Sequence, residues 1–252
     1  MLKAFGVSDI GCVRSGNQDR ILVDDSLGLF LVADGMGGHG HGETAAELAI
    51  TTTQFYVSAS RDRFDVSWPF GYDANRSVDE NRLHTAVQLA NRQVWKKADE
   101  APEYAGMGTT IVSALINEDR AAIGHVGDSR IWLMRDGDLV QLTADDSWVA
   151  GMVRSGALDA KEAKEHSMRS VLTQAVGSSR SIEVHTAEHV LQSGDILLLT
   201  TDGIHGMVDE AVLRSVLFNC TGVDQAAKQL VQAALNNGGP DNASCVLVQY
   251  QS

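Results

Sequence analysis

Short apolar runs of strand length recur along this chain, and several neighbouring runs are separated only by a polar turn. The runs lie at 29–33, 111–116, 121–126, 131–134, 139–142, 196–201 and 244–249. Asn117-Glu118-Asp119 separates the second run from the third, and Asp136-Gly137-Asp138 separates the fourth from the fifth. Polar turns of this kind between apolar runs are typical of β-hairpins, whose strands are antiparallel. The pattern therefore predicts antiparallel sheets.

Helical patterns lie between these runs. Leu83, Ala86, Val87, Ala90 and Val94 recur at the spacing of one helix face. Similar patterns predict helices over 42–55, 149–156, 160–166 and 223–235. We expect an α+β fold in which helices cover antiparallel sheets, rather than a doubly wound parallel sheet. The charged stretch from Ser58 to Ser77 fits neither pattern, and we interpret it as a long surface loop.

Composition limits the class of protein. The 252 residues are 44% hydrophobic and show neither a linker nor an internal repeat, which favours one domain over 1–252. The net charge of −13 argues against nucleic-acid binding. The three cysteines, Cys12, Cys220 and Cys245, have no metal-binding spacing and are interpreted as reduced core thiols. With no signal peptide or membrane-spanning run, we expect a cytoplasmic protein, and we expect a monomer.

Aspartates stand at the ends of the apolar runs. Asp34 follows 29–33, Asp128 follows Val126-Gly127, Asp202 follows 196–201, and Asp241 precedes the last run. A single Asp-Gly pair usually marks only a turn, and we interpret Asp136-Gly137 in that way. Recurrence at strand ends is different, because the ends of packed strands can share one rim. Carboxylates gathered there repel one another unless cations lie between them. Oxygen ligands of this kind suit Mg²⁺ or Mn²⁺.

The motifs around these aspartates, taken in order, resemble the bacterial branch of the PPM/PP2C family of metal-dependent serine/threonine phosphatases. They are Val13-Arg14-Ser15-Gly16-Asn17-Gln18-Asp19, Val32-Ala33-Asp34-Gly35-Met36-Gly37-Gly38, Gly106-Met107-Gly108-Thr109-Thr110, Gly124-His125-Val126-Gly127-Asp128-Ser129-Arg130, Thr201-Asp202-Gly203 and Asp241-Asn242. Each motif alone is weakly specific, whereas the ordered set spans nearly the whole chain. The resemblance implies two packed antiparallel sheets flanked by helices, an α-β-β-α sandwich with a dinuclear metal site at one end.

The resemblance also implies roles for individual residues. Asp34 bridges two metal ions, and the carbonyl of Gly35 completes the coordination of one of them. Asp202 and Asp241 bind the second ion, and Asp19 holds waters of the metal site. Asp128, with Asp202, matches a third and weaker metal site of bacterial members. Arg14 matches the residue that grips the substrate phosphate; from sequence alone, a surface salt bridge is the other interpretation.

Some positions depart from the family pattern or carry less weight. Met36 stands where many animal members have a histidine that is proposed as general acid. The family's usual histidine after Leu-Thr-x-Asp is replaced by Asp146, so no role is carried over to that position. His39 and His41 are interpreted as solvated loop residues, and we give His205 little weight as a site residue. Residues 147–179 resemble the family's flap, which would screen protein substrates.

The resulting hypothesis is hydrolysis of phosphoserine and phosphothreonine in proteins by metal-activated water. Two tightly bound Mn²⁺ or Mg²⁺ ions and a third weaker ion are expected, with Arg14, Asp34 and Asp202 as the catalytic residues. The expected partners are phosphorylated proteins, including a bacterial Ser/Thr kinase that the enzyme opposes. Two alternatives remain: a catalytically inactive family member that serves as a binding module, and a hydrolase of small phosphoesters.

Overall fold

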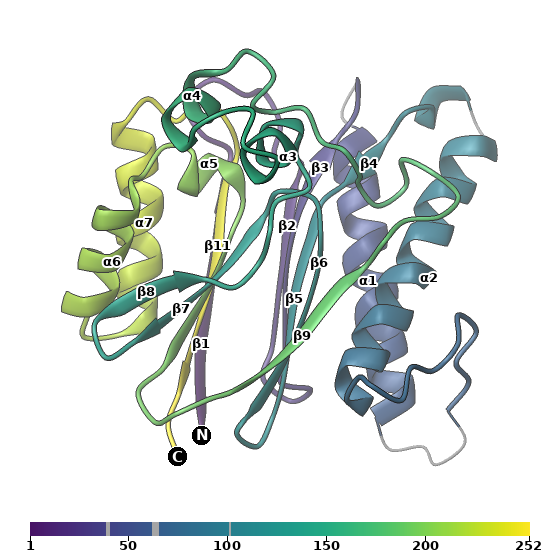
Figure 1. Ribbon diagram of the computed structural model, residues 1–252, viewed down its shortest axis with the longest axis horizontal. Helices are drawn as coiled ribbons and strands as arrows, with labels where there is room; N and C mark the ends of the chain where they lie inside the picture. The colour runs from purple at the N-terminus through teal and green to yellow at the C-terminus, as the bar shows by residue number, and fades with distance from the viewer. Residues whose placement is uncertain (39–40, 62–65, 101) are drawn as a thin grey trace.

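Two antiparallel β-sheets pack face to face between helices in the computed structural model, which describes residues 1–38, 41–61, 66–100 and 102–252 (Figure 1). One sheet contains, in order, β1 (Leu2–Asp9), β11 (Ala243–Tyr250), β10 (Ile196–Thr200), β7 (Arg130–Arg135) and β8 (Asp138–Gln141). The other contains β2 (Asp19–Asp24), β3 (Leu29–Met36), β5 (Ile111–Asn117), β6 (Arg120–Val126) and β9 (His185–Val190), with β4 (Gly108–Thr109) paired to β3. The α-β-β-α sandwich predicted from the resemblance is confirmed.

The longer helices cover the outer faces of the two sheets. Helices α1 (His41–Arg61) and α2 (Val78–Glu100) pack on the sheet that contains β3, and α6 (Glu210–Asn219) and α7 (Val223–Asn236) pack on the other (Figure 1). The short helices α3 (Trp148–Arg154), α4 (Ala160–Glu165) and α5 (Asp202–His205) gather at one end of the sandwich, and η2 (Pro102–Tyr104) follows α2. Within the described ranges, no helix is long and apolar enough to cross a bilayer.

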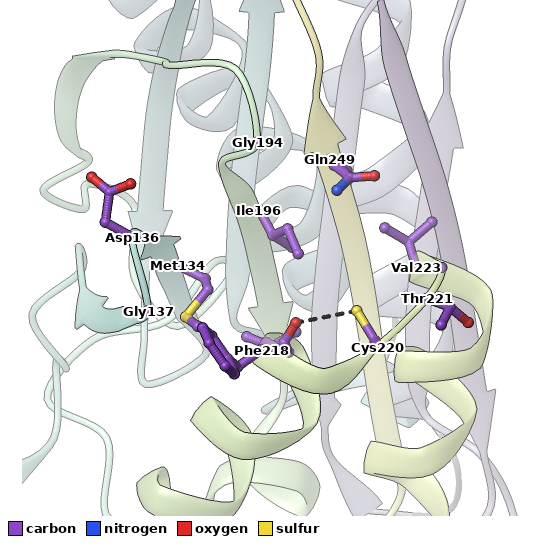
Figure 2. Close-up of a pocket in the computed structure, with 12 residues that line it drawn as sticks. Met134, Asp136, Gly137, Gly194, Ile196, Phe218, Cys220, Thr221, Val223 and Gln249 are labelled. Atoms are coloured by element: carbon purple, nitrogen blue, oxygen red, sulfur yellow. Dashed lines mark hydrogen bonds between the residues drawn. The ribbon is translucent and has the colours of Figure 1, made fainter.

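A cavity of about 210 Å³ opens between the start of β10 and the end of α6 (Figure 2). Its lining includes Ile196 and the exposed Phe218. The half-buried thiol of Cys220 also lines it and donates a hydrogen bond to the Leu217 carbonyl at 3.2 Å. Because Ile196 opens β10 and Asp202 follows its end, this cavity lies a strand length away from the predicted carboxylates.

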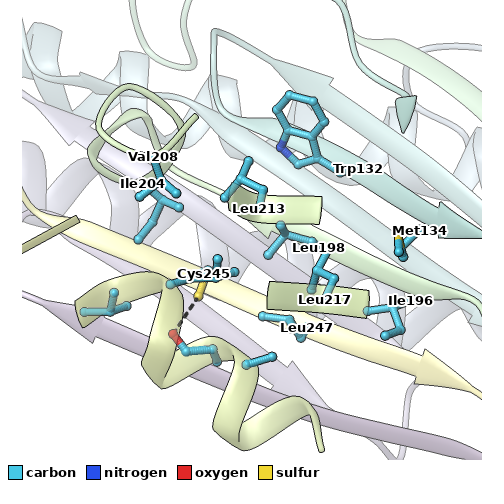
Figure 3. Packing of buried hydrophobic residues seen from close by; sticks show 14 of the residues in the cluster. Trp132, Met134, Ile196, Leu198, Ile204, Val208, Leu213, Leu217, Cys245 and Leu247 are labelled. Atoms are coloured by element: carbon cyan, nitrogen blue, oxygen red, sulfur yellow. Dashed lines mark hydrogen bonds between the residues drawn. The ribbon is translucent and has the colours of Figure 1, made fainter. Parts of the chain in front are cut away.

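Strand β10 shows why some runs are apolar at every position rather than alternating. Leu197 and Leu199 pack between the two sheets, whereas Ile196 and Leu198 point to the opposite face. On that face they meet side chains of α6 such as Leu217 (Figure 3). Both faces of the strand are therefore dry, and each fully buried Leu side chain contributes about 2 kcal/mol of transfer free energy. This burial on both faces holds β10 in place and so positions Asp202, which follows its end.

Several boundaries differ from the sequence predictions. The predicted loop from Ser58 is wrong at its start, because α1 continues to Arg61. The two predicted hairpins are confirmed, with Glu118 and Asp136 at positive φ in the turns. The sequence analysis did not predict the following elements: β1, β2, β4, β9, α5, α6 and η2. The strands among them are short or only partly buried, so their apolar runs are broken.

Candidate active site

Strands β2 and β3 bring the first two predicted aspartates together. In the antiparallel register, Asp19 lies directly opposite Asp34. The expectation that Asp34 follows the end of its strand is wrong by a few residues, because β3 continues to Met36 and pairs there with β4. The close approach of α1 explains why glycine follows Asp34: a Cβ on Gly35 would lie 2.1 Å from the carbonyl oxygen of Gly42.

The end of β10 supplies the next carboxylate. Asp202 is the first residue of α5, and Thr201 occupies the N-cap position without a side-chain hydrogen bond to the helix. The hydroxyl of Thr201 donates to Asp19 Oδ2 at 3.0 Å and accepts a hydrogen bond from the Ser244 amide at 3.1 Å. Thr201 therefore orients the carboxylate of Asp19 from the neighbouring sheet. Asp241 lies just before β11, so the strand pairing of β10 with β11 brings it to the same end.

Asp128 lies in the turn between β6 and β7. Gly127 precedes it with a φ of 102°, a conformation that side chains disfavour. Thr110 links this turn to β3, because its hydroxyl hydrogen-bonds to Ser129 Oγ at 2.7 Å and accepts from the Asp34 amide at 3.0 Å. Thr110 carries no role in the sequence analysis, and only the packed structure identifies it as the link between two candidate carboxylates.

Six of the seven predicted site residues line one cleft of about 260 Å³. Its lining comprises Arg14, Gly16, Gln18, Asp34, Gly35, Met36, Gly37, Thr110, Asp128, Ser170, Leu172, Asp202, Asp241 and Asn242. The seventh residue, Asp19, is buried behind the cleft with 1% of its surface exposed. Among residues 1–38, 41–61, 66–100 and 102–252, no three His, Cys, Asp or Glu side chains converge on one point as a finished ligand cluster.

Burial and mutual repulsion make the ionised carboxylates costly here. Burial raises the pKa of Asp19 to about 7, and burial together with the charge of Asp202 raises the pKa of Asp128 to about 7. Burial, reinforced by the charge of Asp19, places the pKa of Asp34 well above its usual range. Burial and the charge of Asp241 also raise the pKa of Asp202. The Oδ1 atoms of Asp19 and Asp202 are buried without a hydrogen-bond partner.

These features fit divalent cations. A cation beside the carboxylates would restore their ionised forms, and buried oxygens without a partner are free to act as ligands. The donors are all oxygens, which suits Mg²⁺ or Mn²⁺ rather than a soft metal.

Arg14 is the cation that the structure places in the cleft. Its Nη2 lies 2.7 Å from Asp241 Oδ2, and the two side chains are 55% and 35% exposed. The salt bridge that the sequence analysis weighed as an alternative is therefore present. The loop that carries Arg14 is held by Asn242, whose side-chain amide donates to the carbonyls of Ile10 and Gly16 at 2.9 and 3.0 Å. Asn242 Oδ1 also accepts from the Gln18 amide at 2.8 Å.

Neither His41 nor His205 is among the residues that line the cleft. His205 is half-buried in α5, and its Nδ1 lies 2.9 Å from the hydroxyl of Thr200, so a site role for it is not supported. His41 is the first residue of α1 rather than part of a loop, and its ring meets that of Tyr104 edge to face at 4.8 Å. His39 lies outside the described residues.

The segment that resembles a flap reaches the cleft. It contains α3 and α4, both close to their predicted positions, and its Ser170 and Leu172 line the cleft. Leu172 pairs in an isolated bridge with Ser147, which holds the later part of the segment against its beginning.

Comparison with known proteins gives a consistent result. A family model described as "Protein phosphatase 2C" matches residues 13–237. A putative protein phosphatase 2C-type protein of Streptococcus pyogenes is 32% identical, over 97% of this chain and 96% of that protein. The serine/threonine protein phosphatase PstP of Mycobacterium tuberculosis is 34% identical over 98% of this chain, which spans 45% of PstP.

A solved structure extends the likeness to three dimensions. It is the catalytic domain of PstP in complex with two manganese ions, and it superposes with a TM-score of 0.85 at 29% identity. The match covers 100% of this chain and 99% of that one. The family match over most of the chain, the relatives and the shared architecture lead to one conclusion: this chain belongs to the protein phosphatase 2C family.

Proposed function

We propose that this chain hydrolyses phosphoserine and phosphothreonine esters in proteins with the help of divalent metal ions. The observation that carries the proposal is the gathering of Asp34, Asp128, Asp202 and Asp241 with one arginine in a single cleft. A cleft with this charge pattern has little affinity for an anionic substrate by itself. With cations on the carboxylates it becomes a site for a phosphate group.

The chain offers distinct ligands for the ions. Asp34 would bridge two of them, with the Gly35 carbonyl on one and with Asp202 and Asp241 on the other. Asp19, held by Thr201, would hold waters of the site from behind, and Asp128 with Asp202 would hold a third and weaker ion. When bound, Mn²⁺ or Mg²⁺ ions supply a nucleophilic water of lowered pKa and neutralise charge on the phosphate oxygens.

Arg14 would bind and orient the phosphate. Its guanidinium presents a planar fork that matches two phosphate oxygens, and its exposure in the cleft leaves it accessible. To bind the phosphate, the Arg14 side chain would have to break its salt bridge to Asp241. The backbone of its loop would stay in place, because Asn242 holds the loop at Ile10 and Gly16. Ser170 and Leu172 border the same cleft, so the segment 147–179 would contact the protein around the phosphorylated residue.

The phosphorylated partners would include a bacterial Ser/Thr kinase that the enzyme opposes. The names of the relatives support protein substrates: PhpP of Streptococcus pneumoniae is a protein phosphatase that is 32% identical over 96% of this chain. An inactive binding module is less favoured, because the whole predicted set of aspartates is present. A small-phosphoester hydrolase would use the same centre and differ in substrate preference.

Rates on a phosphothreonine peptide and on a small aryl phosphate, each with Mn²⁺ and with excess chelator, test the proposal. We expect metal-dependent release of phosphate, with the higher kcat/KM for the phosphopeptide. Asp34→Asn, which keeps the shape of the side chain, should lower turnover by several powers of ten. Full activity in chelator would overturn the metal mechanism, and inactivity toward both substrates would favour the binding module.

A further inference from the structure

Asp146 stands where the family's usual histidine is absent, and the structure places it at a junction. The residue lies between β8 and α3 and is 7% exposed. Its Oδ2 accepts a hydrogen bond from the Gly127 amide at 3.0 Å and another from Gln174 Nε2 at 3.0 Å. Its Oδ1 lies 3.1 Å from His185 Nε2. One carboxylate thus joins three segments that are distant in sequence.

The backbone of Asp146 repeats two of these connections. Its amide donates to the Gly127 carbonyl at 2.9 Å, and its carbonyl accepts from the Thr173 amide at 2.8 Å. Gly127 precedes Asp128, and Thr173 follows Leu172, so each partner is adjacent to a residue that lines the cleft. Asp146 itself is nearly buried and does not line the cleft, so it would act on the cleft through these neighbours.

The partners of Asp146 are themselves fixed. Gln174 also exchanges hydrogen bonds with the Glu183 backbone at 3.0 and 3.1 Å. The ring of His185 stacks on that of His125 at 4.9 Å, and His125 Nε2 lies 3.1 Å from the Ala144 carbonyl oxygen. These contacts link β6 and β9 to the segment 172–174. We call His125, Asp146, Gln174 and His185 the Asp146 network.

We propose that Asp146 is a positioning residue that couples the segment 170–174 to the turn that carries Asp128. The inference rests on the proposed function, because the cleft wall and Asp128 have a role only if the cleft binds a phosphoprotein. Removing the carboxylate leaves the Gly127 amide and the Gln174 side chain without their shared acceptor. The wall of the cleft and the Asp128 turn then keep only the backbone bonds of residue 146 as their link, whereas the ligands around Asp34 keep their own contacts.

A buried carboxylate that only stabilises the fold is the competing explanation, and the chain offers a matched control. Asp195 is 3% exposed, binds Arg135 at 2.9 and 2.6 Å, and accepts from the Gln192 amide at 2.7 Å. It lies just before β10, at the end opposite Asp202. Asp195→Ala therefore removes a buried, ion-paired aspartate that has no connection to the cleft.

Two measurements on the full chain do not depend on catalysis. The first is hydrogen exchange of the amides from 170 to 176, and the second is the rate of tryptic cleavage after Arg169, which is exposed. We expect Asp146→Ala to accelerate both by about tenfold or more, because the segment opens locally. Asp195→Ala should lower Tm comparably and leave both rates at the parent value. Asp146→Asn keeps an acceptor oxygen for Gly127 and should restore most of the protection.

The kinetic signature is a difference between substrates. Asp146→Ala should raise KM for the phosphopeptide and the Mn²⁺ concentration needed for half-maximal turnover, each by about fivefold or more. The kcat for a small aryl phosphate should stay within about threefold of the parent, because that substrate makes little contact with the cleft wall. Of the hydrogen bonds to Asp146, Gln174→Ala removes only the one from Gln174, so it should open the segment without changing the Mn²⁺ requirement. This variant replaces Asp146→Ala in the test if Asp146→Ala does not fold.

The outcomes are separable. If Asp146→Ala resembles Asp195→Ala, with a lower Tm but parent-like exchange, cleavage and substrate preference, Asp146 is only structural and the inference is wrong. If the parent protein hydrolyses neither substrate, the proposed function fails, and exchange with cleavage still decides whether Asp146 couples the two segments.

Discussion

Arg14 Nη2 lies 2.7 Å from Asp241 Oδ2, so the cation proposed for the substrate phosphate is paired with a carboxylate proposed for a metal ion. Neither group can bind its ligand fully while the pair is closed. The pair is nevertheless a weak competitor, because both side chains are more than a third exposed and exposed ion pairs contribute at most about 1 kcal/mol. Metal binding and phosphate binding should therefore both open it easily.

Replacing Arg14 should affect the substrate more than the metal. We expect Arg14→Ala to raise KM and lower kcat for a phosphopeptide, with a combined loss of about 2–3 kcal/mol in transition-state stabilisation. The Mn²⁺ concentration for half-saturation should change by less than about fivefold, in line with the weak pair. Steady-state kinetics and metal titration by calorimetry measure the two effects. Equal shifts in KM and metal affinity would make Arg14 a structural partner of Asp241.

Neutralising Asp202 should destroy activity and yet stabilise the metal-free protein. Asp202→Asn removes a predicted metal ligand, so turnover should fall by several powers of ten. In chelator the same change removes a half-buried charge that repels Asp241 and Asp34, so Tm should rise. Asp136→Asn, in the exposed β7–β8 turn, is the control and should change neither quantity. A lower Tm for Asp202→Asn in chelator would show that the aspartate stabilises the fold without metal.

The sequence predicted the strands whose two faces are both buried. The runs that became β5, β6, β7 and β10 were found because packing on each side leaves them apolar at nearly every position. Strand β9 was not predicted from the sequence, because its residues are mostly half-buried and two of them are histidines. Strand β9 lies at the edge of its sheet and is held there by pairing with β6. The residues of β9 alone do not predict that pairing.

The acidic residues of the site could be predicted from the sequence, but the residues that hold them in position could not. Asp128, Asp202 and Asp241 were visible because each adjoins an apolar run, and the ordered motifs supplied Arg14 and Asp19. Contacts across the sheets were not visible. Gly203 illustrates this, because a Cβ on it would lie 1.8 Å from the Asn242 carbonyl oxygen. Two segments distant in sequence approach there without a side chain between them, and only the packed structure reveals that approach.

His205 should make stability depend on pH. Burial holds its pKa well below the usual value near 6.5, so the folded protein keeps the ring neutral while the unfolded chain takes up a proton. The unfolded state therefore binds more protons below about pH 6.5, and stability is lost as the pH falls through that value. The free energy of unfolding of the parent, relative to that of His205→Gln, should fall by about 1.4 kcal/mol per pH unit below 6.5. Urea melts in chelator at pH 7.5 and 5.5 measure this change, and a stability difference that stays constant between them would contradict a neutral ring in the folded protein.

Asp128 is the residue for which a third metal site and a purely structural role make opposite predictions. As a turn cap, its loss would cost about 1 kcal/mol of stability and little activity. The turn has other supports, however, in the Thr110–Ser129 hydroxyl contact and in the Gly127 bonds to Asp146. Its half-buried carboxylate lines the cleft near Asp202, where burial and the Asp202 charge make ionisation costly without a cation.

We therefore expect Asp128→Ala to keep two tightly bound ions and lose most turnover on a phosphoprotein, with a Tm in chelator equal to or above that of the parent. A weak site shared with Asp202 fills only at high metal concentration, so crystals grown in high Mn²⁺ should contain a third ion in the parent and lack it in the variant. If Asp128→Ala instead keeps parent-like turnover and has a lower Tm, Asp128 only stabilises the turn, and the third ion has no part in the mechanism.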